Sequence, residues 1–134
     1  MWTLFTIPDG LSLYLIMKIN SICENRDYKK VYSRGKTIVT PCVVIYIFRN
    51  KQSNLRLGIT ASKKVGNAVK RNRARRVLKE GVVELLDLLP TCYDVVLVAR
   101  AKTPFVKSTF IKKILLSNFK KIGLIEWKKY LYIL

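Results

Sequence analysis

The stretch LRLGITASKKVGNAVKRNRARRVLKEGVVELLDLL at residues 55–89 decides the fold, because a strand pattern, a bend and a helix pattern follow one another in it. Leu55, Leu57 and Ile59 alternate with polar or small residues, which is the period of two expected for a strand with one buried face. A short basic bend follows at residues 63–67. Beyond it, apolar residues recur at spacings of three and four and predict a helix with one buried stripe, made of Ala74, Val77, Leu78, Val82, Leu85, Leu88 and Leu89.

Positive charge dominates the side of this predicted helix that faces away from the apolar stripe. Eight Lys or Arg residues and no acidic residue lie between positions 63 and 79. At about 100° per residue, Asn72, Arg73, Arg76 and Lys79 fall opposite the stripe. A solvated helix usually mixes charges of both signs, because oppositely charged pairs four residues apart stabilise it. The pattern therefore favours a surface that a polyanion neutralises.

The same residues carry a family resemblance. Residues 63–76, KKVGNAVKRNRARR, resemble the signature of the bacterial ribonuclease P protein family, including its Arg-Asn-Arg core. Two weaker motifs in the expected order extend the resemblance over about residues 20–123: N-x-D-Y-x-x-V-Y-x-x-G at 25–35 and YDVV at 93–96. In that family an RNA subunit, with magnesium ions, removes the 5′ leader from precursor tRNA. The resemblance implies both RNAs as partners, Mg²⁺ bound mainly by the RNA subunit, and no organic cofactor, membrane or obligate protein partner.

The resemblance also assigns candidate binding residues. The bend and the basic helix would bind the RNA subunit through Lys63, Lys64, Asn67, Lys70, Arg71, Asn72, Arg73, Arg75, Arg76 and Lys79. A cleft would hold the leader through Tyr28, Tyr32, Tyr46 and Arg56. By pattern alone, Tyr28 and Tyr32 at helical spacing are more typical of a core, and the resemblance reverses that preference. Asn72 has two open roles, contact with a base edge or support of the bend. Val43 stands where many relatives carry Phe, which implies a less aromatic cleft.

Composition sets outer bounds on the function. The chain has 134 residues, 26 of them basic and 8 acidic, so its formal charge is +18. A single domain of this size can bury a substantial core, and the charge favours nucleic acid or an anionic membrane over an acidic protein as partner. No segment reaches the ~18 to 20 apolar residues of a membrane span. Three widely spaced cysteines and no histidine argue against the usual zinc patterns and favour a reducing, cytoplasmic location.

Catalytic chemistry is poorly supported by the side chains themselves. A protein nuclease needs a general base such as His, or clustered carboxylates that hold metal ions. Glu80, Glu84 and Asp87 share one helix side, but a solvated face is the favoured interpretation, since metal sites need converging oxygens. The bend lacks the GxxxxGK[ST] spacing of a phosphate-binding loop. We predict a binding protein whose catalyst lies elsewhere. The alternatives are a general RNA-binding or ribosomal-type protein, a self-sufficient nuclease and, least favoured, a membrane-surface protein.

The remaining elements follow from local patterns. A helix is expected at residues 24–34, capped by Asn25 and ended by Gly35. A strand at 43–48 and a polar turn at 49–54 predict a hairpin with the strand that begins at Leu55. The apolar run at 93–99 is typical of a central strand. A second long helix is expected at 105–121, with Gly123 as its cap and with Phe110, Ile114 and Phe119 in the core.

These elements predict one α+β domain of order α-β-β-β-α-β-α, in which helices pack on a four-stranded sheet. The domain spans residues 18–123, between an N-terminal extension at 1–17, disordered or upstream of the true start, and a C-terminal tail at 124–134. The general rule makes a β-α-β crossover right-handed. The resemblance implies the left-handed crossover of the ribonuclease P protein family instead.

Overall fold

A computed structural model describes residues 20–22, 24–51 and 54–125 of the chain. The expectations for the extension at 1–17, for most of the tail and for Cys23 lie outside the described residues. The predicted α+β class is confirmed: in the described ranges there are three α-helices and four main strands, and the two-residue strand β1 adds a fifth strand to the predicted sheet of four. In chain order the elements are β1 (Asn20–Ser21), α3 (Asn25–Arg34), β2 (Lys36–Val39), β3 (Val43–Arg49), β4 (Arg56–Thr60), η1 (Lys63–Val65), α4 (Ala68–Val83), η2 (Leu86–Leu88), β5 (Tyr93–Ala99), η3 (Thr103–Phe105) and α5 (Ser108–Lys121), where η marks a 3₁₀ turn.

The strands form one mixed sheet in the order β1-β4-β5-β3-β2. β4 and β5 are parallel, whereas β5 and β2 both run antiparallel to β3. The predicted hairpin of β3 with β4 is therefore wrong, because β5 lies between these strands. The polar turn marks a change of direction without fixing the neighbour, and the central place goes to β5, which is apolar on both faces. The helix α4 joins parallel β4 and β5, and the hand of that crossover stays a prediction.

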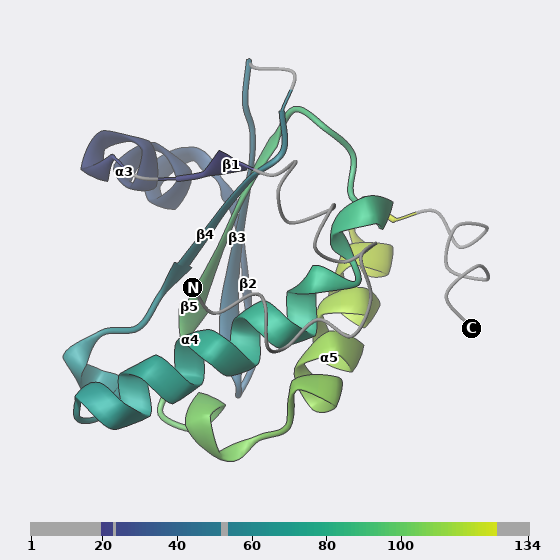
Figure 1. Ribbon diagram of the computed structural model, residues 1–134. Coiled ribbons are helices and arrows are strands. Elements are labelled where there is room, and N and C mark those ends of the chain that lie inside the picture. The colour runs from purple at the N-terminus through teal and green to yellow at the C-terminus, as the bar shows by residue number, and fades with distance from the viewer. Residues whose placement is uncertain (1–19, 23, 52–53, 126–134) are drawn as a thin grey trace.

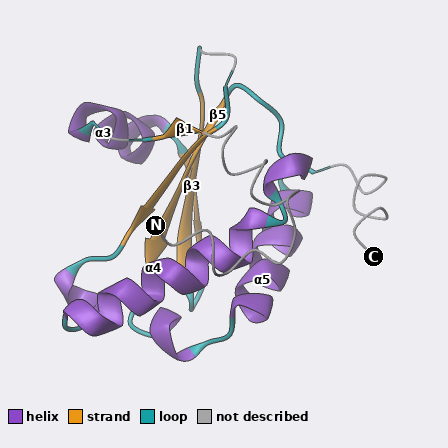
Figure 2. Ribbon diagram, in the orientation of Figure 1, coloured by secondary structure: helices purple, strands orange, loops and turns teal. Residues whose placement is uncertain are grey.

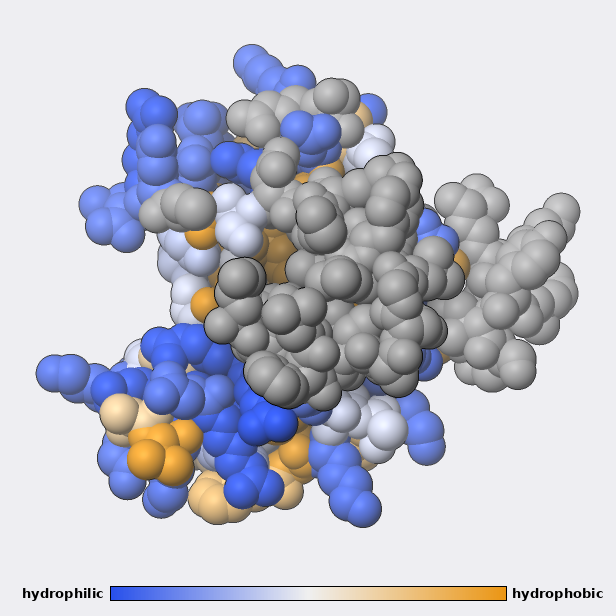
Figure 3. Space-filling model, in the orientation of Figure 1, coloured by the Kyte–Doolittle hydropathy of each residue, from blue (hydrophilic) through white to orange (hydrophobic). Residues whose placement is uncertain are grey.

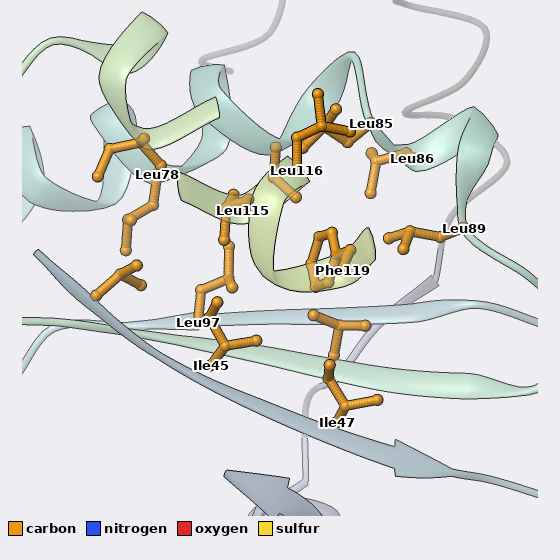
Figure 4. Packing of buried hydrophobic residues seen from close by; sticks show 14 of the residues in the cluster. Ile45, Ile47, Leu78, Leu85, Leu86, Leu89, Leu97, Leu115, Leu116 and Phe119 are labelled. Carbon is orange, nitrogen blue, oxygen red and sulfur yellow. The ribbon is translucent and has the colours of Figure 1, made fainter. Parts of the chain in front are cut away.

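Helices cover the sheet on both faces (Figures 1 and 2). α3 lies on one face, over a small core that includes Val31 and Val96. α4 and α5 lie against each other on the opposite face and enclose the main core. Alternate residues of the central strands serve the two layers, so that Val96 faces α3 and its neighbour Leu97 faces α4 and α5. In Figure 4, the sheet side chains Ile45, Ile47 and Leu97 point towards Leu78, Leu85, Leu86, Leu89, Leu115, Leu116 and Phe119.

The helix α4 begins and ends for local reasons. Asn67 caps its start, and the Asn67 side-chain oxygen accepts a hydrogen bond from the backbone N–H of Lys70 at 3.0 Å. The helix ends at Val83 and does not continue to Leu89 as the periodicity predicted. The chain tightens into η2 after Val83, and that turn still buries Leu86 and Leu88. The buried stripe is thus confirmed and the length of the helix is corrected.

The other two helices also differ from the prediction at their starts. Glu24 precedes α3 without a side-chain cap, so the assignment of Asn25 as cap is wrong. α5 begins at Ser108, and both Phe105 and Phe110 are exposed, so Phe110 is not a core residue. Gly123 ends α5 as predicted. With φ at +80°, it lets the N–H of Leu124 donate to the Phe119 carbonyl at 2.9 Å.

Candidate nucleic-acid interface

Five exposed cations on η1 and α4 form a basic surface, defined here as Lys63, Lys64, Lys70, Arg73 and Arg76. The apolar stripe on the other side of α4 packs into the main core, which turns these residues outward. Asn67 and Asn72 are exposed beside them. The structure therefore exposes most of the predicted RNA-subunit residues on η1, on the cap residue Asn67 and on α4.

Two further arginines of the signature brace the bend between β4 and α4. Arg71 donates from Nη1 to the carbonyl of Gly66 at 3.1 Å, and Arg75 reaches the carbonyl of Ala61 at 3.5 Å. Both arginines are half-buried. Arg75 also donates to the side-chain oxygen of Asn72 at 3.0 Å. Asn72 thus supports the bend indirectly, by holding an arginine that contacts the backbone there.

The cations of α4 differ in how far the protein neutralises them. The Nε of Arg76 lies 3.3 Å from Oε1 of Glu80, one helical turn away. Within residues 20–125 as described, the side chain of Arg73 makes no ion pair or hydrogen bond. Lys79 is half-buried, and its pKa is lowered, first because burial penalises the ammonium and second because Arg75 repels it. Among the four arginines of the signature, Arg73 is consequently the one whose charge is left most open to an outside anion.

A tyrosine row, defined as Tyr28, Tyr32 and Tyr46, lies on the opposite face of the sheet. The ring centroids of Tyr32 and Tyr46 are 4.8 Å apart, with the rings edge to face, and those of Tyr28 and Tyr32 are 6.1 Å apart. Tyr32 is 39% exposed, whereas Tyr28 and Tyr46 are half-buried. The row is therefore partly core and partly surface, and its accessible ring is that of Tyr32.

Strand register explains why the three rings meet. Gly58 of β4 and Tyr46 of β3 both stand opposite Val96 of β5, so they occupy one row across the sheet. Tyr28 lies over Gly58, where an added Cβ would stand 2.8 Å from the tyrosine ring. The glycine thus makes room for the first ring, and Tyr46 supports the second, Tyr32. Val43 does not belong to this face, because it is buried in the main core. The expectation that Val43 makes the cleft less aromatic is wrong.

The fourth predicted cleft residue, Arg56, is held in an ion-pair network. It donates to both carboxylate oxygens of Asp94, from Nε at 2.8 Å and from Nη2 at 2.6 Å, and it reaches Asp27 at 3.2 Å. The Arg56 side chain is 14% exposed and Asp94 is 1% exposed. These partners, Asp94 above all, raise the Arg56 pKa further above its already high ordinary value, although burial opposes the rise. Asn50 adds a 2.6 Å hydrogen bond to Asp94.

This network changes how Arg56, a predicted cleft residue, is interpreted. Arg56 and Asp94 stand side by side on parallel strands, so their pairing requires the long-range β4–β5 register. The sequence motif at 93–96 contained Asp94 without indicating its partner. Because two carboxylates already neutralise Arg56, the guanidinium links β4, β5 and α3 in this structure, and its contact with RNA remains a prediction.

The described residues were also compared with the requirements of a metal site and of a membrane-spanning helix. No group of three or more His, Cys, Asp or Glu side chains in the described ranges could hold a metal ion. Glu80 and Glu84, predicted as a solvated face, pair with Arg76 and Lys112. Where the structure describes the chain, no helix has the length and hydrophobicity needed to cross a membrane.

Comparisons with known proteins agree on one family. The family model described as Ribonuclease P matches residues 16–123. The "Ribonuclease P protein component" of Clostridium botulinum is 38% identical over 109 residues, which cover 81% of this chain and 98% of the relative. The protein of the same name from Bacillus mycoides is 34% identical over 113 residues, covering 84% and 98%.

Solved structures give the same result for the fold. The RNase P protein of Staphylococcus aureus superposes with a TM-score of 0.68 at 28% identity, covering 79% of this chain and 97% of that one. The RNase P protein of Thermotoga maritima has a TM-score of 0.66 and covers 76% and 96%. At 24% identity the second likeness supports the fold alone.

Proposed function

The chain belongs to the ribonuclease P protein family, and from this premise we propose that it binds two RNAs at separate surfaces. The basic surface on α4 binds the RNA subunit of ribonuclease P. The tyrosine row holds the 5′ leader of precursor tRNA. The chain thereby assists removal of the leader in the cytoplasm, and the RNA subunit carries out the hydrolysis.

The exposure of Arg73 is the observation that carries the proposal. Arg73 is the second arginine of the Arg-Asn-Arg core, it points away from the main core, and no described carboxylate pairs with it. A planar guanidinium in this position can donate two parallel hydrogen bonds to a phosphate. The neighbouring cations of the basic surface add attraction without an acidic residue between positions 63 and 79.

The tyrosine row supports the leader-binding part of the proposal. Single-stranded RNA is commonly held by stacking its bases on aromatic rings, at about 1–3 kcal/mol per base. Tyr32 offers an accessible ring that Tyr46 holds from behind at 4.8 Å. Because the tyrosine row and α4 lie on opposite faces of the sheet, one RNA can occupy each surface without displacing the other.

The division of labour assigns magnesium to the RNA subunit. We assign magnesium mainly to the RNA subunit, and in the described ranges no group of three or more His, Cys, Asp or Glu side chains could hold a metal ion. The side chains that the proposal uses bind phosphate or stack on bases, and the sequence offers no histidine as a general base.

Reconstitution with a bacterial ribonuclease P RNA tests the proposal. At low magnesium concentration, the wild-type chain is expected to speed cleavage of precursor tRNA and to lower the magnesium requirement. Failure to do both would contradict the role in leader removal. Equal binding to unrelated structured RNAs, measured by competition at fixed salt, would instead indicate a general RNA-binding protein.

Replacement of Tyr32 tests the leader surface separately. Tyr32→Ala removes a stacking ring, so the preference for precursor over mature tRNA is expected to fall about fivefold, which corresponds to ~1 kcal/mol. Tyr32→Phe keeps the ring and serves as the matched control. Affinity for the RNA subunit alone should stay unchanged in both variants. A loss of precursor preference that is as large with Phe as with Ala would rule out stacking.

A further inference from the structure

The turn η3 presents one aromatic ring next to the start of α4. Thr103 in this turn is fully buried, and its hydroxyl accepts a hydrogen bond from the Arg100 N–H at 2.8 Å and donates one to the Cys42 carbonyl. Pro104 is also buried. The N–H of Phe105 closes the turn on the Lys102 carbonyl at 3.0 Å. The backbone that carries Phe105 is therefore held in one conformation by the protein beneath it.

The side chain of Phe105 points outward from this anchored turn and is 73% exposed. A single exposed phenylalanine is ordinary on a protein surface. This ring, however, lies at the basic surface, with the Lys70 ammonium 5.7 Å from its centroid. Figure 3 shows hydrophobic surface enclosed by hydrophilic groups at the lower left, where α4 begins. One face of the ring is thus associated with a cation, and much of the remainder is open to solvent.

Lysines flank this turn on both sides in the sequence. Lys102 precedes the turn and Lys107 follows it, and both are exposed. The first acidic residue of α4, Glu80, comes ten residues after Lys70, about 15 Å further along the helix axis. A purely apolar partner would have to bury these ammonium groups without compensation, which is costly. An unpaired nucleotide can cover the exposed ring with its base and neutralise the lysines with its phosphates.

We propose that Phe105 stacks on an unpaired nucleobase of an RNA partner, with Lys70, Lys102 and Lys107 holding the adjacent phosphates. The site extends the basic surface from phosphate contact to contact with a base. The identification of that RNA as the ribonuclease P RNA subunit rests on the proposed function. The stacking itself rests on the exposed ring, the rigid turn and the surrounding cations.

Binding of ribonuclease P RNA across a range of salt concentrations tests the stacking. Phe105→Leu keeps an apolar side chain but removes the aromatic face, so affinity is expected to fall about five- to tenfold. Its salt slope should stay at the wild-type value, because no phosphate contact is lost. Phe105→Tyr should bind like wild type. Lys70→Gln should instead lower the salt slope by about 1.

Phe110→Leu is the matched control, since Phe110 is another exposed phenylalanine, 48% exposed, on the neighbouring helix. It should bind RNA as tightly as the wild-type chain. Thermal unfolding of each variant checks that the exposed substitutions leave the fold intact. Wild-type affinity in Phe105→Leu, or the same loss in Phe110→Leu, would overturn the proposal.

Photocrosslinking gives an independent readout of contact with a base. RNA that carries 5-bromouridine at its unpaired positions is expected to crosslink to the peptide containing residue 105, and the crosslink should vanish in Phe105→Leu. Absence of that crosslink from the wild-type complex would overturn the proposal. If the wild-type chain shows no preference for ribonuclease P RNA, the proposed function fails, and the same comparison of variants still decides the stacking on whichever structured RNA binds.

Discussion

Arg56 and Arg73 show two opposite uses of the same side chain. Arg56 lies on β4, and Asp94 of β5 and Asp27 of α3 neutralise it within the protein. Arg73 lies on the far side of the sheet, exposed on α4, and has no such partner among the described residues. A formal charge of +18 counts both equally. The difference teaches that the positions of the described acidic residues, more than the excess of basic ones, determine which cations are left to face a polyanion.

Loss of Asp94 is the strongest way to break this contrast. Asp94→Ala leaves the largely buried Arg56 guanidinium without its main partner, so the free energy of unfolding is expected to fall by about 3–5 kcal/mol. Urea denaturation followed by circular dichroism would measure it. Glu24→Ala is the control, because the Glu24–Arg26 pair is exposed and should contribute less than ~1 kcal/mol. Equal losses in the two variants would show that the network is not a structural support.

Crowding the tyrosine row is expected to have the next largest effect. In Gly58→Ala the new methyl group would lie 2.8 Å from the Tyr28 ring, which must move, and overpacking of this kind costs about 1–3 kcal/mol. Precursor tRNA should also bind less tightly, since the row is disturbed. Combining Gly58→Ala with Tyr28→Leu removes the obstructing ring and should restore part of the stability. No recovery in the double variant would contradict this cause.

Replacement of Arg73 tests the exposed member of this pair of arginines. Arg73→Ala is expected to leave the free energy of unfolding nearly unchanged. It should lower the salt slope of RNA-subunit binding by about 1, because the variant no longer displaces a counterion from one phosphate. Arg76→Ala should lower it less, since Glu80 already neutralises part of that charge. Arg26→Ala on α3 is the control and should keep the wild-type slope. A slope that does not change in Arg73→Ala would mean that this residue does not meet phosphate.

The smallest effect concerns the protonation of Lys79. Its pKa is lowered, so as the pH rises from neutrality it loses its charge before an ordinary lysine with a pKa of about 10.4 would. RNA affinity should therefore weaken at a lower pH in the wild-type chain than in Lys79→Arg, whose charge persists. The folded protein disfavours the charged lysine, so this residue's contribution to stability increases as the pH rises through its folded pKa. Identical pH profiles in the two proteins would exclude Lys79 from the interface.

The local sequence pattern was enough to predict the basic surface, but it could not predict the ion pairs of Arg56 with Asp94 and Asp27. The stripe of α4 predicted that Asn72, Arg73 and Arg76 turn outward, since a helix has one period and one buried side. Lys79, predicted to lie with them, is half-buried. The pairing of Arg56 with Asp94 could not be predicted in this way, because it depends on two strands 38 residues apart becoming parallel neighbours. The hairpin error has the same origin, because turn residues at 49–54 do not exclude a later strand from the space between β3 and β4.

Errors at helix ends have a different physical cause. Apolar spacing continues past Val83, because the 3₁₀ turn η2 buries leucines as an α-helix would. At the start of α5, burial of Thr103 and Pro104 fixes a separate turn and leaves Phe105 outside the helix. Helical spacing of apolar residues alone placed Phe110 in the core and Phe105 in the first turn of the helix. Only the observed packing shows that Phe119 fills the core and that the other two rings face solvent.

The central position of β5 has a consequence for how the chain is made. β3 and β4 emerge from the ribosome well before residues 93–99 do, and neither can complete its pairing without that later strand. During this interval the edge of β3 that will face β5 has no partner, which is the situation in which nascent chains join wrongly. The surplus of positive charge then offers a second benefit, because neighbouring unfinished copies repel one another until the last strand closes the sheet.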